Sequence, residues 1–143
     1  MAEPVSIIAS AITIAATAAQ LSLALFKVAE TFRHAPEEIS EIAEEISTLS
    51  NSLNVLVDVL RAYHGLCTPK LFHQIDSILQ RFEQVERQLV DLTSPREKKL
   101  KRLRWFFSAP RAKGLLKKVE SIKTALTLVI TIIRLATEQA ARQ

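Results

Sequence analysis

The sequence is poor in residues that break or cross-link a chain, with two glycines, five prolines and one cysteine among 143 residues. So few glycines cannot build a glycine-rich phosphate-binding loop, which excludes P-loop and dinucleotide-binding folds. The scarcity of turn-forming residues also disfavours a β-sandwich or β-barrel, because these folds need many short strands. Cys67 has no partner for an internal disulfide, so we expect a reducing, intracellular setting.

Apolar residues, in contrast, are abundant. Hydrophobic residues make up 48% of the chain and charged residues 24%, a balance typical of a soluble globular protein. A chain of this length can bury enough surface to fold without disulfides or metals. We therefore expect a single domain over residues 1–143.

Charge is distributed unevenly along the chain. Residues 1–50 contain two basic and seven acidic side chains, whereas residues 96–123 contain eleven basic and two acidic ones. The second segment thus accounts for the formal net charge of +4. A basic cluster of this kind can attract phosphates of lipid or nucleic acid, attract acidic segments of its own chain, or form a solvated surface.

Two helices are predicted in the middle of the chain, because apolar residues there recur at alternating spacings of four and three. The first runs from about Pro36 to Tyr63 and the second from Pro69 to Leu92, with Gly65 as a stop and Thr68 as an N-cap. The first apolar seam consists of Ile39, Ile42, Ile46, Leu49, Leu53, Leu56, Leu60 and Tyr63. The second consists of Leu71, Ile75, Ile78, Phe82, Val85, Leu89 and Leu92.

A last helix is predicted from Leu115 to near the C-terminus by the same spacing. Its seam consists of Leu115, Val119, Ile122, Leu126, Val129, Ile133, Ala136 and Ala140. Leu128, Ile130 and Ile132 are expected to broaden its buried face, as in a helix that is central in a bundle or covered by a partner. With an N-terminal helix, these helices predict an all-α, antiparallel four-helix bundle.

The N-terminal helix is unusual because residues 4–26 contain no ionisable side chain and are long enough to span a bilayer. A polar stripe follows one side and consists of Ser6, Ser10, Thr13, Thr17 and Gln20. The candidate membrane-inserting residues lie elsewhere on the helix and are Ile7, Ile8, Ile12, Ile14, Leu21 and Leu25. Two interpretations stay open. In the first, the alanines of this helix let it pack closely within the bundle. In the second, the helix lies in or beside the bundle at rest and later enters a bilayer.

A short basic and aromatic segment, residues 96–107, precedes the last helix. Its candidate contacts with anionic lipid are Lys98, Lys99, Lys101, Arg102, Arg104 and Trp105. Cations and aromatic rings interleaved in this way are typical of segments at a membrane interface. The alternative is that the aromatic rings cap one end of the bundle while the lysines are solvated. Nucleic acid is disfavoured as a partner, because no stacking platform or repeated basic face accompanies the charge.

Signals for catalysis or metal binding are weak. His64, Cys67 and His73 lie close together in sequence, but a structural zinc site needs four ligands. A nucleophilic Cys67 would need an oriented base and an oxyanion hole, for which the sequence provides no group. The glutamates of the second helix resemble a solvated helix face. We therefore predict no enzyme activity, no metal and no cofactor.

Several stretches together carry a family resemblance: residues 1–15, 49–56, 103–107 and 115–128. With them the chain resembles the HeLo-like N-terminal domains of fungal NOD-like (STAND) receptors over most of its length. Many relatives have glycines in the first helix, where this sequence has Ala9, Ala11 and Ala15. The resemblance implies a four-helix domain that precedes a nucleotide-binding oligomerisation module in the same chain and acts in heterokaryon incompatibility or immune-like cell death.

The resemblance further implies a domain that self-associates on activation and moves from the cytoplasm to the plasma membrane. Our first hypothesis combines this with the chargeless helix: clustering would place the basic segment on anionic lipid, and residues 4–26 would insert as a group. The second hypothesis is a non-enzymatic bundle that pairs with itself or an adaptor and has no bilayer step. Charge placed at the outward positions Ile8 or Ile12 would disrupt the assembly in that case.

Overall fold

The computed structural model describes residues 3–31, 36–93 and 109–142. Four long α-helices account for almost all of them: α1 (Pro4–Thr31), α2 (Pro36–Tyr63), α3 (Pro69–Thr93) and α5 (Ala109–Arg142). A short 3₁₀ helix, η1 (His64–Leu66), joins α2 to α3. The predicted all-α bundle is therefore confirmed. The basic and aromatic segment predicted before the last helix, residues 96–107, lies within residues 94–108, outside the described part of the chain.

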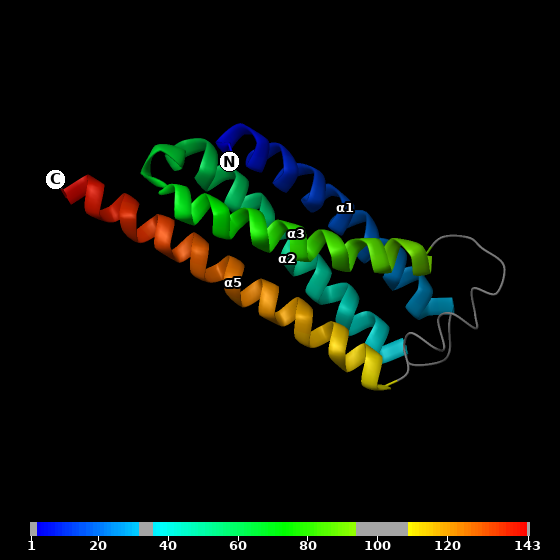
Figure 1. Cartoon of the computed structure of the whole chain (residues 1–143). Helices are drawn as coiled ribbons and strands as arrows, with labels where there is room; N and C mark the ends of the chain where they lie inside the picture. The colour runs from blue at the N-terminus through cyan, green and yellow to red at the C-terminus, as the bar shows by residue number, and fades with distance from the viewer. Residues whose placement is uncertain (1–2, 32–35, 94–108, 143) are drawn as a thin grey trace.

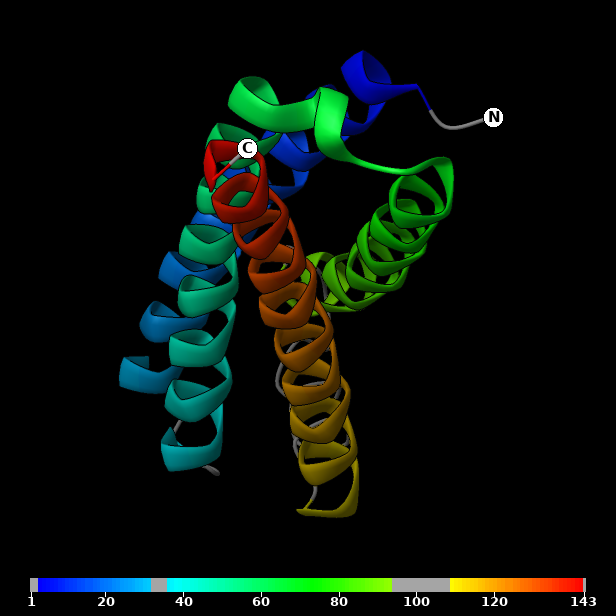
Figure 2. The same cartoon turned by 90° about the vertical axis from the view of Figure 1, so that its left-hand side faces the viewer.

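The helices alternate in direction, so that α1 and α3 run one way while α2 and α5 run the other (Figure 1). Both described ends of the chain and η1 lie at the same end of the bundle (Figure 1). Helix α1 packs against α2 and α3, and these two pack in turn against α5. Seen from the end, α3 is inclined away from the other helices (Figure 2). The most extensive of these interfaces joins α1 to α2.

The predicted seams form the core of the bundle. All seven predicted residues of α3 are buried, as are those of α2 except Tyr63, which is exposed at the end of its helix. Both helices begin with proline at the first position, where the missing N–H leaves no hydrogen bond unmade. Thr68 is the predicted N-cap, and its Oγ1 accepts a hydrogen bond of 3.1 Å from the backbone N–H of Leu71.

Helix α5 begins six residues before the predicted Leu115, at Ala109. Its seam is buried from Leu115 to Ile133, whereas Ala140 is exposed near the C-terminus. The expectation that three additional residues broaden the buried face is correct only for Ile130. Leu128 and Ile132 are exposed, because α2 and α3 cover only one side of α5.

Polar contacts also join α5 to its neighbours. Lys123 Nζ lies 2.8 Å from Glu45 Oε2 on α2, and Arg81 Nη2 on α3 donates to Ser121 Oγ at 3.1 Å. The hydrogen bond to Glu45 raises the pKa of Lys123. The lysine and the glutamate are both partly exposed, so the pair stabilises the bundle by about 1 kcal/mol at most. These contacts thus connect α5 to both α2 and α3 but contribute little to stability.

Candidate functional site

The candidate membrane-inserting residues of α1 mostly face the core. Ile7, Ile14, Leu21 and Leu25 are buried, and Ile8 packs half-buried against the core. Ile12 is 41% exposed. The apolar face of α1 is therefore largely covered by the bundle in this structure.

The predicted polar stripe runs along the side of α1 that borders the groove toward α3 and the solvent. Its members Ser6, Ser10, Thr13 and Gln20 are exposed, and Thr17 is half-buried. Thr13 Oγ1 donates to the carbonyl of Ala9 one turn earlier, at 3.1 Å. The stripe thus gives α1 a soft polar surface without any charge.

A seam of small residues lets α1 approach α2 closely. Ala11, Ala15 and Ala18 are buried, and two buried serines, one on each helix, bond across the interface. Ser22 Oγ donates to the carbonyl of Ala43 at 2.9 Å, and Ser50 Oγ donates to the carbonyl of Ala15 at 2.8 Å.

Sequence reasoning missed the two serines, although Ser22 lies seven residues after Ala15 and therefore on the same face of α1. With these bonds and the buried alanines, α1 is packed within the bundle.

Helix α1 also passes the test of length and composition for a membrane span, alone among the helices of the described residues. Its most apolar window of 18 residues has a mean hydropathy of 1.8, and 39% of that window is buried. Core helices of soluble proteins pass the same test, so this property is necessary for insertion but does not establish it.

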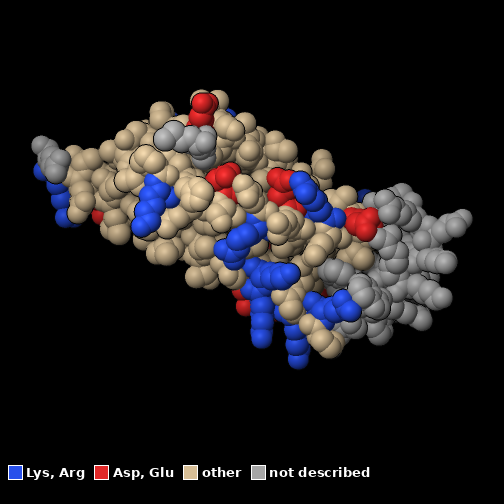
Figure 3. Space-filling model, in the orientation of Figure 1, with Lys and Arg blue, Asp and Glu red and all other residues tan. Residues whose placement is uncertain are grey.

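The residues expected to bind anionic lipid, Lys98, Lys99, Lys101, Arg102, Arg104 and Trp105, lie outside the described residues. The basic cluster continues into α5, where exposed Arg111, Lys113, Lys117 and Lys118 occupy the first turns. Basic side chains gather over this part of the bundle (Figure 3). The described half of the cluster therefore presents a positive surface at one end of the molecule.

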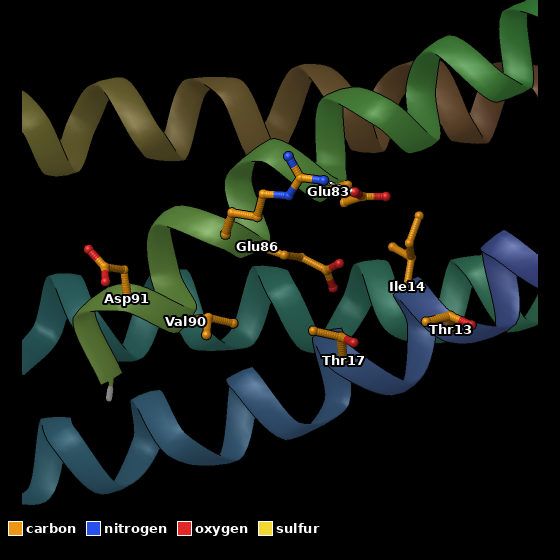
Figure 4. Close-up of a pocket in the computed structure, with 8 residues that line it drawn as sticks. Thr13, Ile14, Thr17, Glu83, Glu86, Val90 and Asp91 are labelled. Carbon is orange, nitrogen blue, oxygen red and sulfur yellow. Dashed lines mark hydrogen bonds and ion pairs between the residues drawn. The ribbon is translucent and has the colours of Figure 1, made fainter. Parts of the chain in front are cut away.

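A groove of about 470 Å³ separates the polar stripe of α1 from α3. Thr13 and Thr17 line it from α1, while Glu83, Glu86 and Asp91 line it from α3 (Figure 4). The groove thus combines uncharged hydroxyl groups on one wall with carboxyl groups on the other.

Glu86 is the unusual member of this groove. Its side chain points toward α1, only 3% of the residue is exposed, and its Oε2 has no hydrogen-bond partner among the described residues (Figure 4). Burial, helped by the negative charge of Glu83, raises the pKa of Glu86 to about 8. Sequence reasoning missed this residue. The signal was its spacing of seven from the buried Leu79, which itself lies seven residues after the buried Phe72.

The residues considered for metal binding do not form a cluster. A ring nitrogen of His64 lies 3.2 Å from the carbonyl of Leu60, and Cys67 Sγ donates to the carbonyl of Tyr63 at 3.8 Å. In residues 3–31, 36–93 and 109–142, no three His, Cys, Asp or Glu side chains are grouped so that they could hold a metal ion. Burial raises the pKa of Cys67, which disfavours its reactive thiolate form.

Comparison with known proteins places the chain in one family. Searches of curated proteins and of solved structures gave no match. The family model described as "Pigment biosynthesis cluster protein PigL N-terminal" matches residues 2–143. This match supports the expectation of a fungal N-terminal domain at that general level. Because the model covers nearly the whole chain, the protein belongs to the family of PigL N-terminal domains.

Proposed function

We propose that this bundle is a non-enzymatic signalling domain of the cell-death executioner type, which oligomerises and delivers α1 to a membrane. The observation that carries the proposal is the absence of ionisable side chains from residues 4–26 of a helix long enough to span a bilayer. A charged residue at the bilayer centre would cost roughly 2.5–3.5 kcal/mol on insertion scales. Helix α1 avoids this cost throughout its apolar stretch.

The free energy of releasing α1 from the bundle depends on whether its buried side chains move into water or into the hydrocarbon of a bilayer. Fully burying a side chain such as Ile7, Leu21 or Leu25 is worth roughly 1.5–3 kcal/mol relative to leaving it in water. Release into water would therefore be strongly unfavourable, because several such side chains lose their cover at once. Release into hydrocarbon keeps the same side chains out of water. A membrane surface beside the bundle is thus required before α1 leaves.

We propose that clustering and charge bring the bundle to that surface. A nucleotide-binding module in the same full-length protein would concentrate several copies, and the basic cluster would hold them on anionic lipid of the plasma membrane. Each cation near an anionic surface contributes about 1 kcal/mol. The exposed Lys113, Lys117 and Lys118 of α5 support this role, together with the lysines and arginines of residues 96–104.

A cross-link between α1 and α2 tests the proposal. Ser50 Oγ reaches the carbonyl of Ala15, so we expect Ala15→Cys and Ser50→Cys in a Cys67→Ser background to form a disulfide across this contact. The protein is clustered by a C-terminal oligomerising tag on phosphatidylserine vesicles, and dye release is measured. We expect leakage from the reduced protein and none from the oxidised protein.

The Cys67→Ser protein, treated with the same oxidant, is the matched control and is expected to release dye. Equal leakage from the oxidised and reduced double-cysteine proteins would refute the release of α1. If no clustered variant releases dye, the membrane proposal fails as a whole.

A second candidate function is a self-associating adaptor without a bilayer step. Exposed apolar side chains on two helices favour it, namely Ile12 on α1 and Leu128, Ile132 and Leu135 on α5. Under this alternative, Ile12→Glu abolishes self-association in sedimentation experiments, and the neighbouring exposed change Ser10→Glu does not. Under the membrane proposal, replacing the five lysines and arginines between positions 98 and 104 by neutral residues abolishes vesicle binding, and the protein stays folded.

A further inference from the structure

The groove between α1 and α3 contains a carboxyl group that the described chain leaves without a partner. Glu86 is 97% buried by area, since 3% of it is exposed, and its Oε2 accepts no hydrogen bond. Buried polar groups are nearly always hydrogen-bonded, and an unsatisfied one costs about 1–3 kcal/mol. A donor from outside the described residues would satisfy Glu86.

The charge around Glu86 favours a cationic donor. Glu83 and Asp91 line the same groove, and Arg87 is the single basic residue among the described residues that line it. Arg87 Nη2 already donates to Glu83 Oε1 one turn earlier on α3. Helix α1 contributes no charged side chain to the groove. Among the described residues, three carboxyl groups and one guanidinium group line the groove, a lining that favours a cationic ligand over an anionic one.

The other residues that line the groove are uncharged and supply hydroxyl groups and aliphatic surface. Thr13 and Thr17 present hydroxyl groups from α1, and the Thr13 hydroxyl keeps its lone pairs free to accept because it donates to Ala9. Ile14 and Val90 supply aliphatic surface beside them (Figure 4). The volume of about 470 Å³ lies in the range of small-molecule sites.

We propose that this groove binds a primary alkylammonium group, whose nitrogen donates to Glu86 and to the hydroxyl oxygens of Thr13 and Thr17. The alkyl chain would lie along Ile14 and Val90. An ammonium group has three donors and no acceptor, which matches one carboxylate and two hydroxyl groups. A metal ion is a poorer match, because the described residues contain no group of three metal-ligating acidic, histidine or cysteine side chains.

Binding should displace a proton. Near neutral pH the buried carboxyl of Glu86 is protonated, because its pKa is raised to about 8. An ammonium group favours the ionised form, so binding releases a proton and becomes tighter as the pH rises from 6 to 9. Among the described residues, the charged groups that line the groove with Glu86 are Glu83, Arg87 and Asp91 of α3, while α1 contributes only hydroxyl and aliphatic groups.

The test is a titration of the 143-residue chain with n-butylammonium chloride, followed by the carboxyl ¹³C signal of Glu86 in NMR spectra. We expect a saturable shift, with release of a proton at pH 7. Glu86→Gln should lose about tenfold or more in affinity, because a charge-assisted hydrogen bond is worth about 1.5–3 kcal/mol. For this variant, binding is followed by ¹⁵N–¹H backbone signals of α3, which also report whether it is folded.

Matched variants separate the site from general charge attraction. Thr17→Val keeps the shape of the side chain, removes one acceptor and should weaken binding. Glu83→Gln should retain most of the affinity, because Glu83 is already engaged by Arg87. The probes n-butanol and tetramethylammonium, which lack the charge and the N–H donors respectively, should not saturate the site.

The proposal is overturned if n-butylammonium gives no saturation, if Glu86→Gln and Thr17→Val both bind as tightly as the parent chain, or if tetramethylammonium binds equally well. A lysine side chain presents the same group as a free amine. Nα-acetyl-lysine methylamide is therefore titrated in parallel. Tighter binding than n-butylammonium indicates a lysine of a polypeptide as the source, and weaker binding indicates a free amine.

Discussion

The buried carboxyl of Glu86 predicts that the stability of the bundle falls as the pH rises. In the folded chain Glu86 keeps its proton up to about pH 8, whereas the ordinary pKa of glutamate is 4.5. Between these values the folded state binds more protons than the unfolded state, so the free energy of unfolding decreases with pH. The contribution is fully present below pH 4.5 and is lost as the pH passes through about 8.

The magnitude follows from proton linkage. One proton held only by the folded state gives a slope of about 1.4 kcal/mol per pH unit. The slope depends only on the number of protons, so screening by water narrows the pH window and leaves the slope unchanged. Over the window from 4.5 to about 8, the loss is at most about 5 kcal/mol.

Urea unfolding of the parent chain and of Glu86→Gln at several pH values isolates the contribution of Glu86 protonation to the free energy of unfolding. The amide has nearly the same shape and does not titrate, so the parent chain should lose stability relative to Glu86→Gln as the pH rises from 5 to 8.5. Glu120→Gln, which changes an exposed glutamate of α5, should follow the parent chain. Parallel curves for the parent chain and Glu86→Gln would refute the buried, protonated carboxyl.

The remaining predictions concern the packing of α1 and α5. Leu25→Ala should lower the free energy of unfolding by about 2–5 kcal/mol through a cavity, whereas Leu23→Ala at an exposed position of the same helix should change it by less than about 1 kcal/mol, as measured by urea unfolding. Ser50→Ala should cost about 1 kcal/mol and should speed amide hydrogen exchange in α1, because it removes a buried bond to that helix. Leu128→Lys should leave the thermal midpoint nearly unchanged, since this side chain is 59% exposed, and should lower any self-association measured by sedimentation.

The buried seams of α2 and α3 could be predicted because their apolar residues recur at spacings of three and four without a break. Pro36 and Thr68 added local signals that fix where helices begin. Exposure at the bundle ends could not be predicted in the same way. Tyr63 and Ala140 continue the spacing of their seams, yet they lie at helix ends where less of the neighbouring helices remains to cover them.

Which helices become neighbours was also beyond the pattern. Leu128 and Ile132 are as hydrophobic as Ile130, but only the last faces α2 and α3. The same limit applies to Glu86, whose burial depends on how closely α1 approaches α3. Periodicity identifies a face of a helix, and only the three-dimensional arrangement identifies what covers that face.

The two sides of α1 differ in how firmly they hold the helix. Toward α2, α1 has its most extensive interface, a seam of alanines and two buried serine hydrogen bonds. Toward α3, the smaller interface includes an open groove and an unsatisfied carboxyl at Glu86. Water entering on the α3 side would satisfy that carboxyl, whereas water entering on the α2 side would replace bonds that are already made. Separation of α1 from the bundle should therefore begin at α3, with the contact to α2 broken last.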